Sequence, residues 1–311
     1  MTLPAHARTK SNAVTIREHR IPSADSKPYI AVEGPDGALW FCESGTSKIG
    51  RFDPDRGVFA EFALPTKDAT PIGITPGADG NLWFAEKTAN KIGRITPRGE
   101  IAEFKLPTPH AGPDGMILGP DGNVWFSESD AGRIGKITPG GRITEYGDGI
   151  TAGAKPLSIA VRDGALWFSE AAGNRIGRIT IDGHVTEFPI PSHDSQPRAM
   201  AAHPDGSIWF VETSTNALGR IDRDGRITEH AVPTPNASLR GVAVGADGDL
   251  WYTANFANKI GRMAPDGIVR GEYAIPTLAS GARCIATFAD GRLFFTQYDA
   301  GLIGEVVLGE A

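Results

Sequence analysis

A tryptophan–phenylalanine pair, or a close relative of it, recurs along this 311-residue chain at an almost constant interval. Successive pairs begin 42 or 43 residues apart. The seven pairs are Trp40-Phe41, Trp83-Phe84, Trp125-Phe126, Trp167-Phe168, Trp209-Phe210, Trp251-Tyr252 and Phe294-Phe295. A repeat of this length is one supersecondary unit that buries its apolar face against a neighbouring copy. The chain is therefore expected to consist of seven similar units packed side by side.

The unit that covers residues 113–146 shows the internal plan of the repeat. Turn sequences such as Pro120-Asp121-Gly122 and Gly140-Gly141 separate short apolar or alternating runs. These runs predict four strands, around 116–118 and over 124–128, 134–138 and 142–146. The 39 Gly and 23 Pro of the chain leave little room for long helices. We therefore predict an all-β fold, a seven-bladed β-propeller with four antiparallel strands in each blade.

The two ends of the chain predict how the ring closes. Residues 15–19 resemble the fourth strand of the other units, whereas the last unit ends after its third strand at 303–307. We expect the N-terminal strand to complete the last blade, which removes the exposed sheet edge. Residues 1–311 would then form a single propeller domain, with 1–12 as a flexible N-terminal tail.

The amino-acid composition limits which binding partners and which cellular compartment are expected. Lys and Arg number 31 against 37 Asp and Glu, a net charge of −6, so no general attraction to nucleic acid or an anionic membrane is expected. Two cysteines are too few for a disulfide framework, and the sequence has no signal-peptide core or transmembrane run. We expect a cytoplasmic protein, and a monomer because no oligomerisation signal is present.

One repeat position varies where core positions do not. It follows the residue, usually proline, that opens the innermost strand, and in a propeller it faces the mouth of the axial channel. It holds Tyr29, Ile72, Asp114, Leu157, Arg198, Arg240 and Arg283. Three consecutive blades thus present arginine to one sector, and a guanidinium suits carboxylate, phosphate or enolate-like oxygens. We interpret Arg198, Arg240, Arg283 and Asp114 as ligand-binding residues; the alternative is that the arginines pair with glutamates of the blades.

Those glutamates end the second strand of five units, at Glu43, Glu86, Glu128, Glu170 and Glu212. A carboxylate repeated so regularly indicates a structural role. The sixth and seventh units carry Ala254 and Gln297 instead, in the sector of Arg240 and Arg283. We interpret this break as the mark of a pocket, which adds Gln297 and its neighbour Tyr298 to the candidate ligand-binding residues.

The repeated motifs resemble those of a known family. Leu82-Trp83-Phe84-Ala85-Glu86 and the run 90–96, Asn-Lys-Ile-Gly-Arg-Ile-Thr, are similar to motifs of the streptogramin B lyases, also called virginiamycin B lyases. The resemblance extends from about Val14 to Val307. It implies a seven-bladed propeller that opens cyclic depsipeptide antibiotics by eliminating across an ester, with help from magnesium, and hence a role in antibiotic resistance.

The resemblance also implies which residues act, and several differ here. The family's tyrosine matches Tyr29, but its two histidines correspond to Arg240 and Arg283. Its carboxylates fall near Gly281 or Ala282 and on Gln297 or Tyr298. Arginine stays protonated and cannot serve as a general base. Magnesium is therefore implied by the resemblance alone, and no metal ligands are predicted.

Three functions remain open. The first is a carbon–oxygen lyase that acts on a cyclic ester or lactone in the channel mouth, with Tyr29, Arg240 and Arg283 as catalytic residues and Tyr29 or Asp114 as the base. The second is a non-catalytic binding protein for an anionic small molecule. The third is a protein-interaction scaffold. In the first two cases the partner is a small molecule that is anionic or bears an ester.

Overall fold

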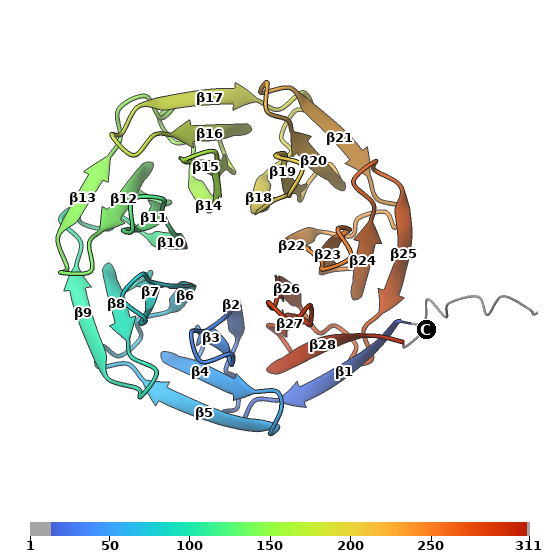
Figure 1. Cartoon of the computed structure of the whole chain (residues 1–311), viewed down its shortest axis with the longest axis horizontal. Coiled ribbons are helices and arrows are strands. Elements are labelled where there is room, and N and C mark those ends of the chain that lie inside the picture. Colours follow the sequence, from blue (N-terminus) through green and yellow to red (C-terminus); the bar gives the residue numbers. More distant parts are fainter. Residues whose placement is uncertain (1–13, 310–311) are drawn as a thin grey trace, which may run out of the picture.

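The computed structural model describes residues 14–309, in which all regular structure is β. The strands β1–β28 form seven separate four-stranded antiparallel sheets that stand radially around a central axis (Figure 1). The predicted seven-bladed propeller is therefore confirmed. The predicted tail, residues 1–12, lies outside the described residues. Between residues 14 and 309 there is no helix with the length and apolar character needed to cross a membrane.

Within each blade the first strand is innermost and the second lies behind it. The innermost strands are β2 (Pro28–Glu33), β6 (Pro71–Pro76), β10 (Pro113–Leu118), β14 (Pro156–Arg162), β18 (Pro197–Ala202), β22 (Leu239–Val244) and β26 (Ala282–Thr287). The second strands are β3 (Leu39–Glu43), β7 (Leu82–Glu86), β11 (Val124–Glu128), β15 (Ala165–Glu170), β19 (Ile208–Glu212), β23 (Leu250–Ala254) and β27 (Leu293–Gln297).

The third and fourth strands complete each blade toward the rim. The third strands are β4 (Lys48–Asp53), β8 (Lys91–Ile95), β12 (Arg133–Ile137), β16 (Arg175–Ile179), β20 (Ala217–Ile221), β24 (Lys259–Met263) and β28 (Leu302–Leu308). The outermost strands are β5 (Val58–Ala63), β9 (Ile101–Lys105), β13 (Ile143–Tyr146), β17 (Val185–Pro189), β21 (Ile227–Ala231), β25 (Val269–Ala274) and β1 (Val14–Arg20).

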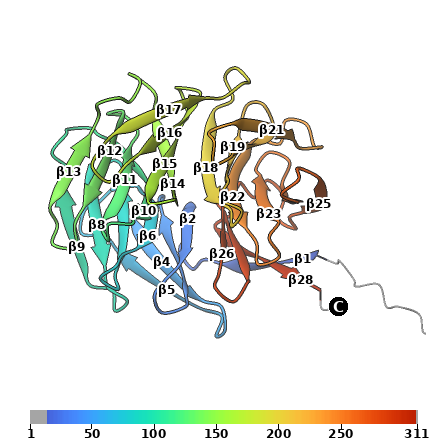
Figure 2. The ribbon, with the colours of Figure 1, turned by 45° about the horizontal axis from the view of Figure 1, so that its top comes forward.

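The ring closes where the chain ends meet. Strand β1 pairs antiparallel with β28, from Val14 opposite Leu308 to Arg20 opposite Leu302, so the N-terminal strand is the fourth strand of the last blade as predicted (Figure 2). Glu18 of β1 also accepts a hydrogen bond from the Thr277 backbone N–H at 3.1 Å. This contact joins β1 to the loop that leads from blade six into blade seven.

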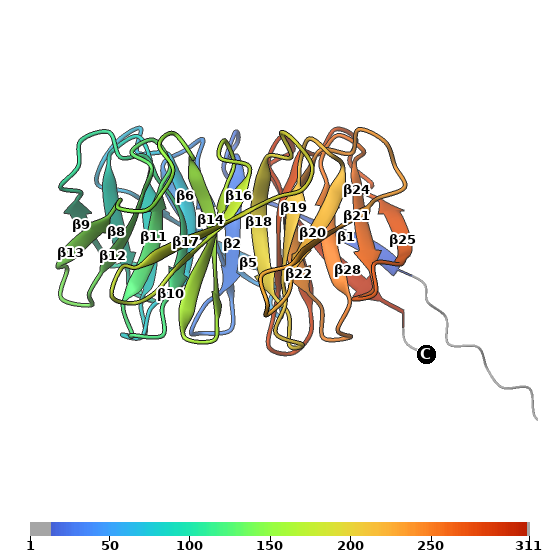
Figure 3. The same ribbon diagram turned by 90° about the horizontal axis from the view of Figure 1, so that it is seen from above.

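The strands cross the disk from one face to the other (Figure 3). Because neighbouring strands are antiparallel, the start of each innermost strand and the end of the second strand lie at the same face. We call this the mouth face. The hairpins between first and second strands, and between third and fourth strands, lie at the opposite face. The fold therefore separates two sets of loops that carry different residues.

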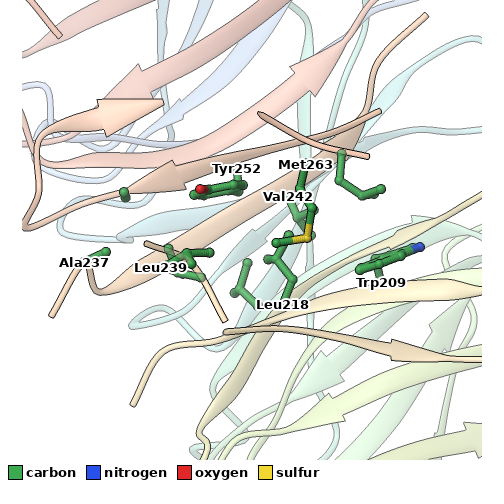
Figure 4. Packing of buried hydrophobic residues seen from close by; sticks show 11 residues of the cluster. Trp209, Leu218, Ala237, Leu239, Val242, Tyr252 and Met263 are labelled. Carbon is green, nitrogen blue, oxygen red and sulfur yellow. The ribbon is translucent and has the colours of Figure 1, made fainter. Parts of the chain in front are cut away.

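The core consists of apolar layers between adjacent blades. Between blades five and six, Trp209 and Leu218 pack with Val242, Tyr252 and Met263, all nearly or completely buried (Figure 4). The repeated tryptophan also stacks on the aromatic residue of its own outermost strand, as when the Trp125 and Tyr146 rings lie 5.5 Å apart. Large aromatic burial of this kind is the main stabilising contribution in each blade.

The glycine in the third strand of the repeat is required by packing. A Cβ atom on Gly135 would lie 2.2 Å from the ring of Phe126, and one on Gly261 would lie 1.9 Å from the ring of Tyr252. The aromatic residue that follows the tryptophan thus lies flat against the third strand. This contact explains why glycine stands in the Ile-Gly part of the repeated motif.

Candidate functional site

The axial channel contains a cavity of about 460 Å³ at the start of the innermost strands. The variable repeat position supplies much of its wall, through Tyr29, Asp114, Leu157, Arg198, Arg240 and Arg283. Ile72, at the same position of blade two, is buried and does not line the cavity. Apolar groups such as Met116 and Val242 complete the wall. The cavity therefore combines a cluster of charges on one side with an apolar surface able to receive an organic ligand.

Arg283 is held between two tyrosines at the joint where the ring closes. Its guanidinium carbon lies 3.9 Å from the ring centre of Tyr298 and 4.9 Å from that of Tyr29. The two rings meet edge to face at 5.9 Å. Stacking on aromatic faces fixes the guanidinium plane and stabilises its charge. Tyr298 does not line the cavity itself, so its observed role is to support Arg283.

Arg198, Arg240 and Arg283 form no ion pair with any carboxylate of the described residues. The Nε atom of each is buried and lacks a hydrogen-bond partner. Burial, followed by repulsion from Arg198 and Arg283, lowers the pKa of Arg240 to about 10. Arg240 therefore still carries its positive charge at neutral pH. The mouth therefore holds a crowded positive sector with unfilled hydrogen-bonding capacity.

Lys87 is a cavity residue that sequence reasoning missed. Its Nζ lies 2.8 Å from Asp114 Oδ2 and 3.0 Å from Ser129 Oγ. Burial raises the pKa of Asp114, and the ion pair with Lys87 opposes that rise. Lys87 follows the last residue of its second strand, a position that also varies among blades. The same test of variability would have identified it.

The blade glutamates do not pair with the arginines. Each interacts instead with a glutamate of the outermost strand of its own blade, as Glu86 does with Glu103 and Glu128 does with Glu145. Burial, followed by the charge of this second glutamate, raises the pKa of Glu86 and of Glu128 to about 8. Glu170 behaves in the same way, and Glu43 and Glu212 reach about 7. The repeated element is thus a carboxylic acid facing a carboxylate, which leaves the arginines free for a ligand.

The break in this pattern has a structural cause, and our interpretation of it as a pocket was wrong. In blade seven, Gln297 Nε2 donates to Glu18 Oε1 at 3.0 Å, so a neutral amide replaces the protonated glutamate. In blade six, Tyr252 replaces phenylalanine and its hydroxyl donates to Glu272 Oε1 at 3.0 Å. Gln297 is fully buried, reaches toward the rim and does not line the cavity. Both blades therefore keep a neutral donor opposite the outer carboxylate.

The residues at the family's magnesium positions do not fit a metal site. Gly281 and Ala282 supply no side-chain oxygen, and Gln297 is engaged by Glu18. The two nearest acids each face a lysine, at 2.8 Å for Asp114 with Lys87 and 3.5 Å for Asp299 with Lys27. Across residues 14–309, no group of three or more His, Cys, Asp or Glu residues is placed to hold a metal ion.

Cys284 also lines the cavity, beside Arg283. Burial raises the pKa of its thiol to about 11, so the thiolate, which is the nucleophilic form, is scarce at neutral pH. Its Sγ lies 3.5 Å from the Ala31 backbone nitrogen. The thiol is therefore part of the wall between blades one and seven.

Solved structures with this architecture include lyases. A streptogramin B lyase structure superposes with a TM-score of 0.90 at 36% identity, covering 95% of this chain and 98% of that one. Virginiamycin B lyase from Staphylococcus aureus gives 0.90 at 38% identity, covering 96% of this chain and 100% of that one. A catalytically inactive variant of the same enzyme, solved with quinupristin, gives equal values.

Sequence comparison leads to the same family. Virginiamycin B lyase from Streptomyces coelicolor is 46% identical over 43 residues, which is 14% of this chain and 14% of that protein. That match therefore spans only a short stretch of either protein. The model of the virginiamycin B lyase family matches residues 7–161 and 148–310, and thus nearly the whole chain. The chain belongs to the virginiamycin B lyase family.

Proposed function

We propose that the channel mouth binds a small molecule through an oxyanion, a carboxylate or an enolate-like oxygen, held by Arg198, Arg240 and Arg283. The observation that carries this proposal is the unpartnered arginine cluster at the cavity wall. Three guanidinium groups in a confined space repel one another, and their buried Nε atoms lose hydration without gaining a hydrogen-bond partner. An anion placed among them removes both penalties. Its planar oxygens match the guanidinium fork.

The shape of the cavity supports an organic ligand over a bare ion. A volume of about 460 Å³ is in the range of small-molecule sites. The wall opposite the arginines includes the apolar side chains of Met116, Leu157 and Ile117 beside the Lys87–Asp114 pair. A ligand with one anionic end and an apolar body would satisfy both sides. Bound against Arg283, it would also meet the ring of Tyr29.

A second candidate function is a carbon–oxygen lyase with a rebuilt site. Membership of the family and the pair Lys87–Asp114 favour it. In such a reaction a base takes a proton from the alcohol part of the ester, at the carbon next to the one that bears the ester oxygen and α to a second carbonyl group, and the electron pair moves to the oxygen of that second carbonyl. When this carbonyl re-forms, a C=C bond forms in the alcohol part, the alkyl C–O bond of the ester breaks, and the acyl part departs as a carboxylate. Asp114 is the carboxylate that the cavity offers as base, and the arginines would stabilise the enolate and then the leaving carboxylate.

Binding is tested by calorimetry with carboxylate probes, from citrate to the ring-opened acid of quinupristin. The double variant Arg240→Ala/Arg283→Ala should weaken binding at least tenfold, because two of three anion contacts are removed. Arg262→Ala is the matched control, since Arg262 is already engaged by Asp249 at 2.7 Å outside the cavity. Equal affinities for the double variant and the wild type would contradict the proposal.

Turnover separates the two functions. Quinupristin is incubated with the protein, with and without magnesium, and followed by liquid chromatography with mass spectrometry. Elimination opens the ring without a change in mass, whereas hydrolysis adds one water. A lyase with Asp114 as base gives the isomeric product in the wild type and none with Asp114→Asn. Binding without any product in either protein supports a binding function.

A further inference from the structure

Basic residues of the third strands are neutralised in most blades at the face opposite the mouth. There, an aspartate in the hairpin between the first two strands contacts the basic residue of the third strand. The pairs are Arg51–Asp36 at 2.7 Å, Arg94–Asp79 at 3.9 Å, Lys136–Asp121 at 3.7 Å, Arg220–Asp205 at 3.2 Å and Arg262–Asp247 at 2.8 Å. This ion pair belongs to the repeat in blades one, two, three, five and six.

Blade four departs from that pattern. Its hairpin is one residue shorter, so that Arg162 pairs with Ala165 across a two-residue turn. Arg162 is only 7% exposed, its Nη1 donates to three backbone carbonyl groups, and its guanidinium carbon lies 3.8 Å from the ring centre of Trp167. The hairpin thus places a cation over the tryptophan. Arg178, the basic residue of the third strand, forms no ion pair with any residue from 14 to 309.

A third guanidinium comes from the next blade. Arg223 lies in the turn between β20 and β21 and packs on the backbone of Gly206, where an added Cβ would meet its Nε at 2.0 Å. Arg223 also has no ion pair among the described residues. Arg162, Arg178 and Arg223 line a cavity of about 350 Å³, together with the aromatic rings of Trp167 and Phe188. Asp163 and Asp224 lie on its wall as well, but neither forms an ion pair with these arginines.

We propose that this pocket is a second ligand site, for a phosphate group, on the face opposite the channel mouth. Arg178 and Arg223 would contact the phosphate oxygens, and Arg162, fixed by the three carbonyl groups, would add a stationary positive charge. A further donor is at hand, because Trp167 is 4% exposed and its Nε1 is buried without a hydrogen-bond partner. The ring of Phe188, which stacks on Trp167 and is itself half-buried, would contact an aromatic substituent on the phosphate.

This site is independent of the proposed function. Arg162 ends its innermost strand, whereas Arg198 and Arg240 stand at the beginning of theirs, so the two clusters lie at opposite faces of the disk (Figure 3). The site is also specific to blade four, because the aspartate of its shorter hairpin, Asp163, forms no ion pair with Arg178, whereas the equivalent cation is neutralised in five other blades. Variants at one site should therefore leave the other unchanged.

The proposal is tested by titrating the protein with inorganic phosphate and with phenyl phosphate at constant ionic strength. Indole N–H resonances report on Trp167, and Trp167→Phe assigns its signal. We expect saturable shifts with both probes and tighter binding of phenyl phosphate. Arg178→Gln/Arg223→Gln should weaken phosphate binding at least tenfold, while the buried Arg162 is kept so that the variant folds.

Two controls make the outcome specific. Arg94→Gln removes the equivalent cation of blade two, which is already paired with Asp79, and should bind phosphate like the wild type. Arg240→Ala/Arg283→Ala removes two of the three arginines at the channel mouth and should also bind phosphate like the wild type. The absence of a saturable shift in the wild type overturns the proposal, as does equal binding in a folded Arg178→Gln/Arg223→Gln variant. Loss of binding in Arg240→Ala/Arg283→Ala assigns the phosphate to the mouth and overturns it as well.

Discussion

The hydroxyl of Tyr252 donates a hydrogen bond to Glu272 at 3.0 Å, and this contact takes the place of the inner glutamate that ends the second strand in blades one to five. Blade six has Ala254 in place of the inner glutamate. It has gained instead the hydroxyl of Tyr252, which lies in the same strand. The buried Glu272 thereby keeps a donor. Blade six thus keeps a polar group opposite its outer carboxylate, although a different residue supplies it.

Tyr252→Phe should therefore destabilise the protein by about 2 kcal/mol, the usual contribution of a buried hydrogen bond to a charged group. Urea unfolding followed by tryptophan fluorescence measures the loss. Adding Ala254→Glu to this variant rebuilds the arrangement of the other blades and should recover part of the stability near pH 5, where the new carboxyl is protonated. An equal loss at pH 5 with and without Ala254→Glu would contradict this reading of blade six.

The acid–carboxylate pairs predict an unusual dependence of stability on pH. The pKa values of Glu43, Glu86, Glu128, Glu170 and Glu212 are raised from 4.5 to about 7 or 8. At pH values between the ordinary pKa and the raised pKa, the folded state binds more protons than the unfolded state. The free energy of unfolding therefore falls as pH rises from about 5 to about 8. Hydrogen bonds outweigh burial and lower the pKa of Glu61, Glu103 and Glu187, so protonation of these outer carboxylates reverses the trend below about pH 4.

Glu86→Gln tests whether the inner glutamates cause this dependence on pH, because blade seven already has a glutamine, Gln297, at the equivalent position. The amide keeps a donor toward Glu103 but does not titrate. The variant should lose less stability than the wild type between pH 5 and pH 8, and should have the higher unfolding midpoint at pH 8. Glu100→Gln, at an exposed position, serves as the control and should follow the wild-type curve.

The sequence was sufficient for the fold because each blade repeats the same local signals. The aromatic pair and the hairpin glycine recur in all seven blades and the proline that begins the innermost strand in five, and each has a local physical reason. Ring closure was predictable as well, since residues 15–19 carry a fourth-strand pattern without the strands that should precede it. Such inferences need only periodicity and turn chemistry.

The partners of side chains were harder to predict. Glu43 and its equivalents end the second strand near the mouth, which suggested contact with the arginines, yet their side chains reach across the third strand to the outermost one. Lys87 was missed, and Tyr298 was predicted to bind the ligand although it supports Arg283, because both roles depend on which neighbour lies within a few ångströms. Spacing in the sequence gives the face and the sector of a residue but not its partner.

The ion pair of Lys87 with Asp114 should contribute to stability as well as to the site. Lys87→Met leaves Asp114, whose side chain is 13% exposed, without its cation, and should cost about 2 kcal/mol. Because the pKa of Asp114 would rise further, the loss should be greater at pH 8 than at pH 5. Lys27→Met is the control, since its partner Asp299 is 54% exposed and the pair contributes little.

A double-mutant cycle completes this test. Asp114→Asn in the Lys87→Met background removes the stranded charge and should recover most of the loss, with a smaller dependence on pH. Urea midpoints of the four proteins at pH 5 and pH 8 give the coupling free energy. A coupling near zero at both pH values would show that the two residues do not act as a pair.

Arg240 should destabilise the protein when no ligand is bound. Its guanidinium is partly buried beside Arg198 and Arg283, and its Nε has no partner. Arg240→Met keeps much of the side-chain volume and removes the repulsion, so the free energy of unfolding should rise by about 1 kcal/mol. Added sodium chloride should narrow this difference, because salt screens the repulsion only while the charge is present.

Arg262→Met, which breaks contacts with Asp247 and Asp249, should instead lower stability. If Arg240→Met proved less stable than the wild type in ligand-free buffer, the arginine cluster would be a structural element and not a site held ready for an anion.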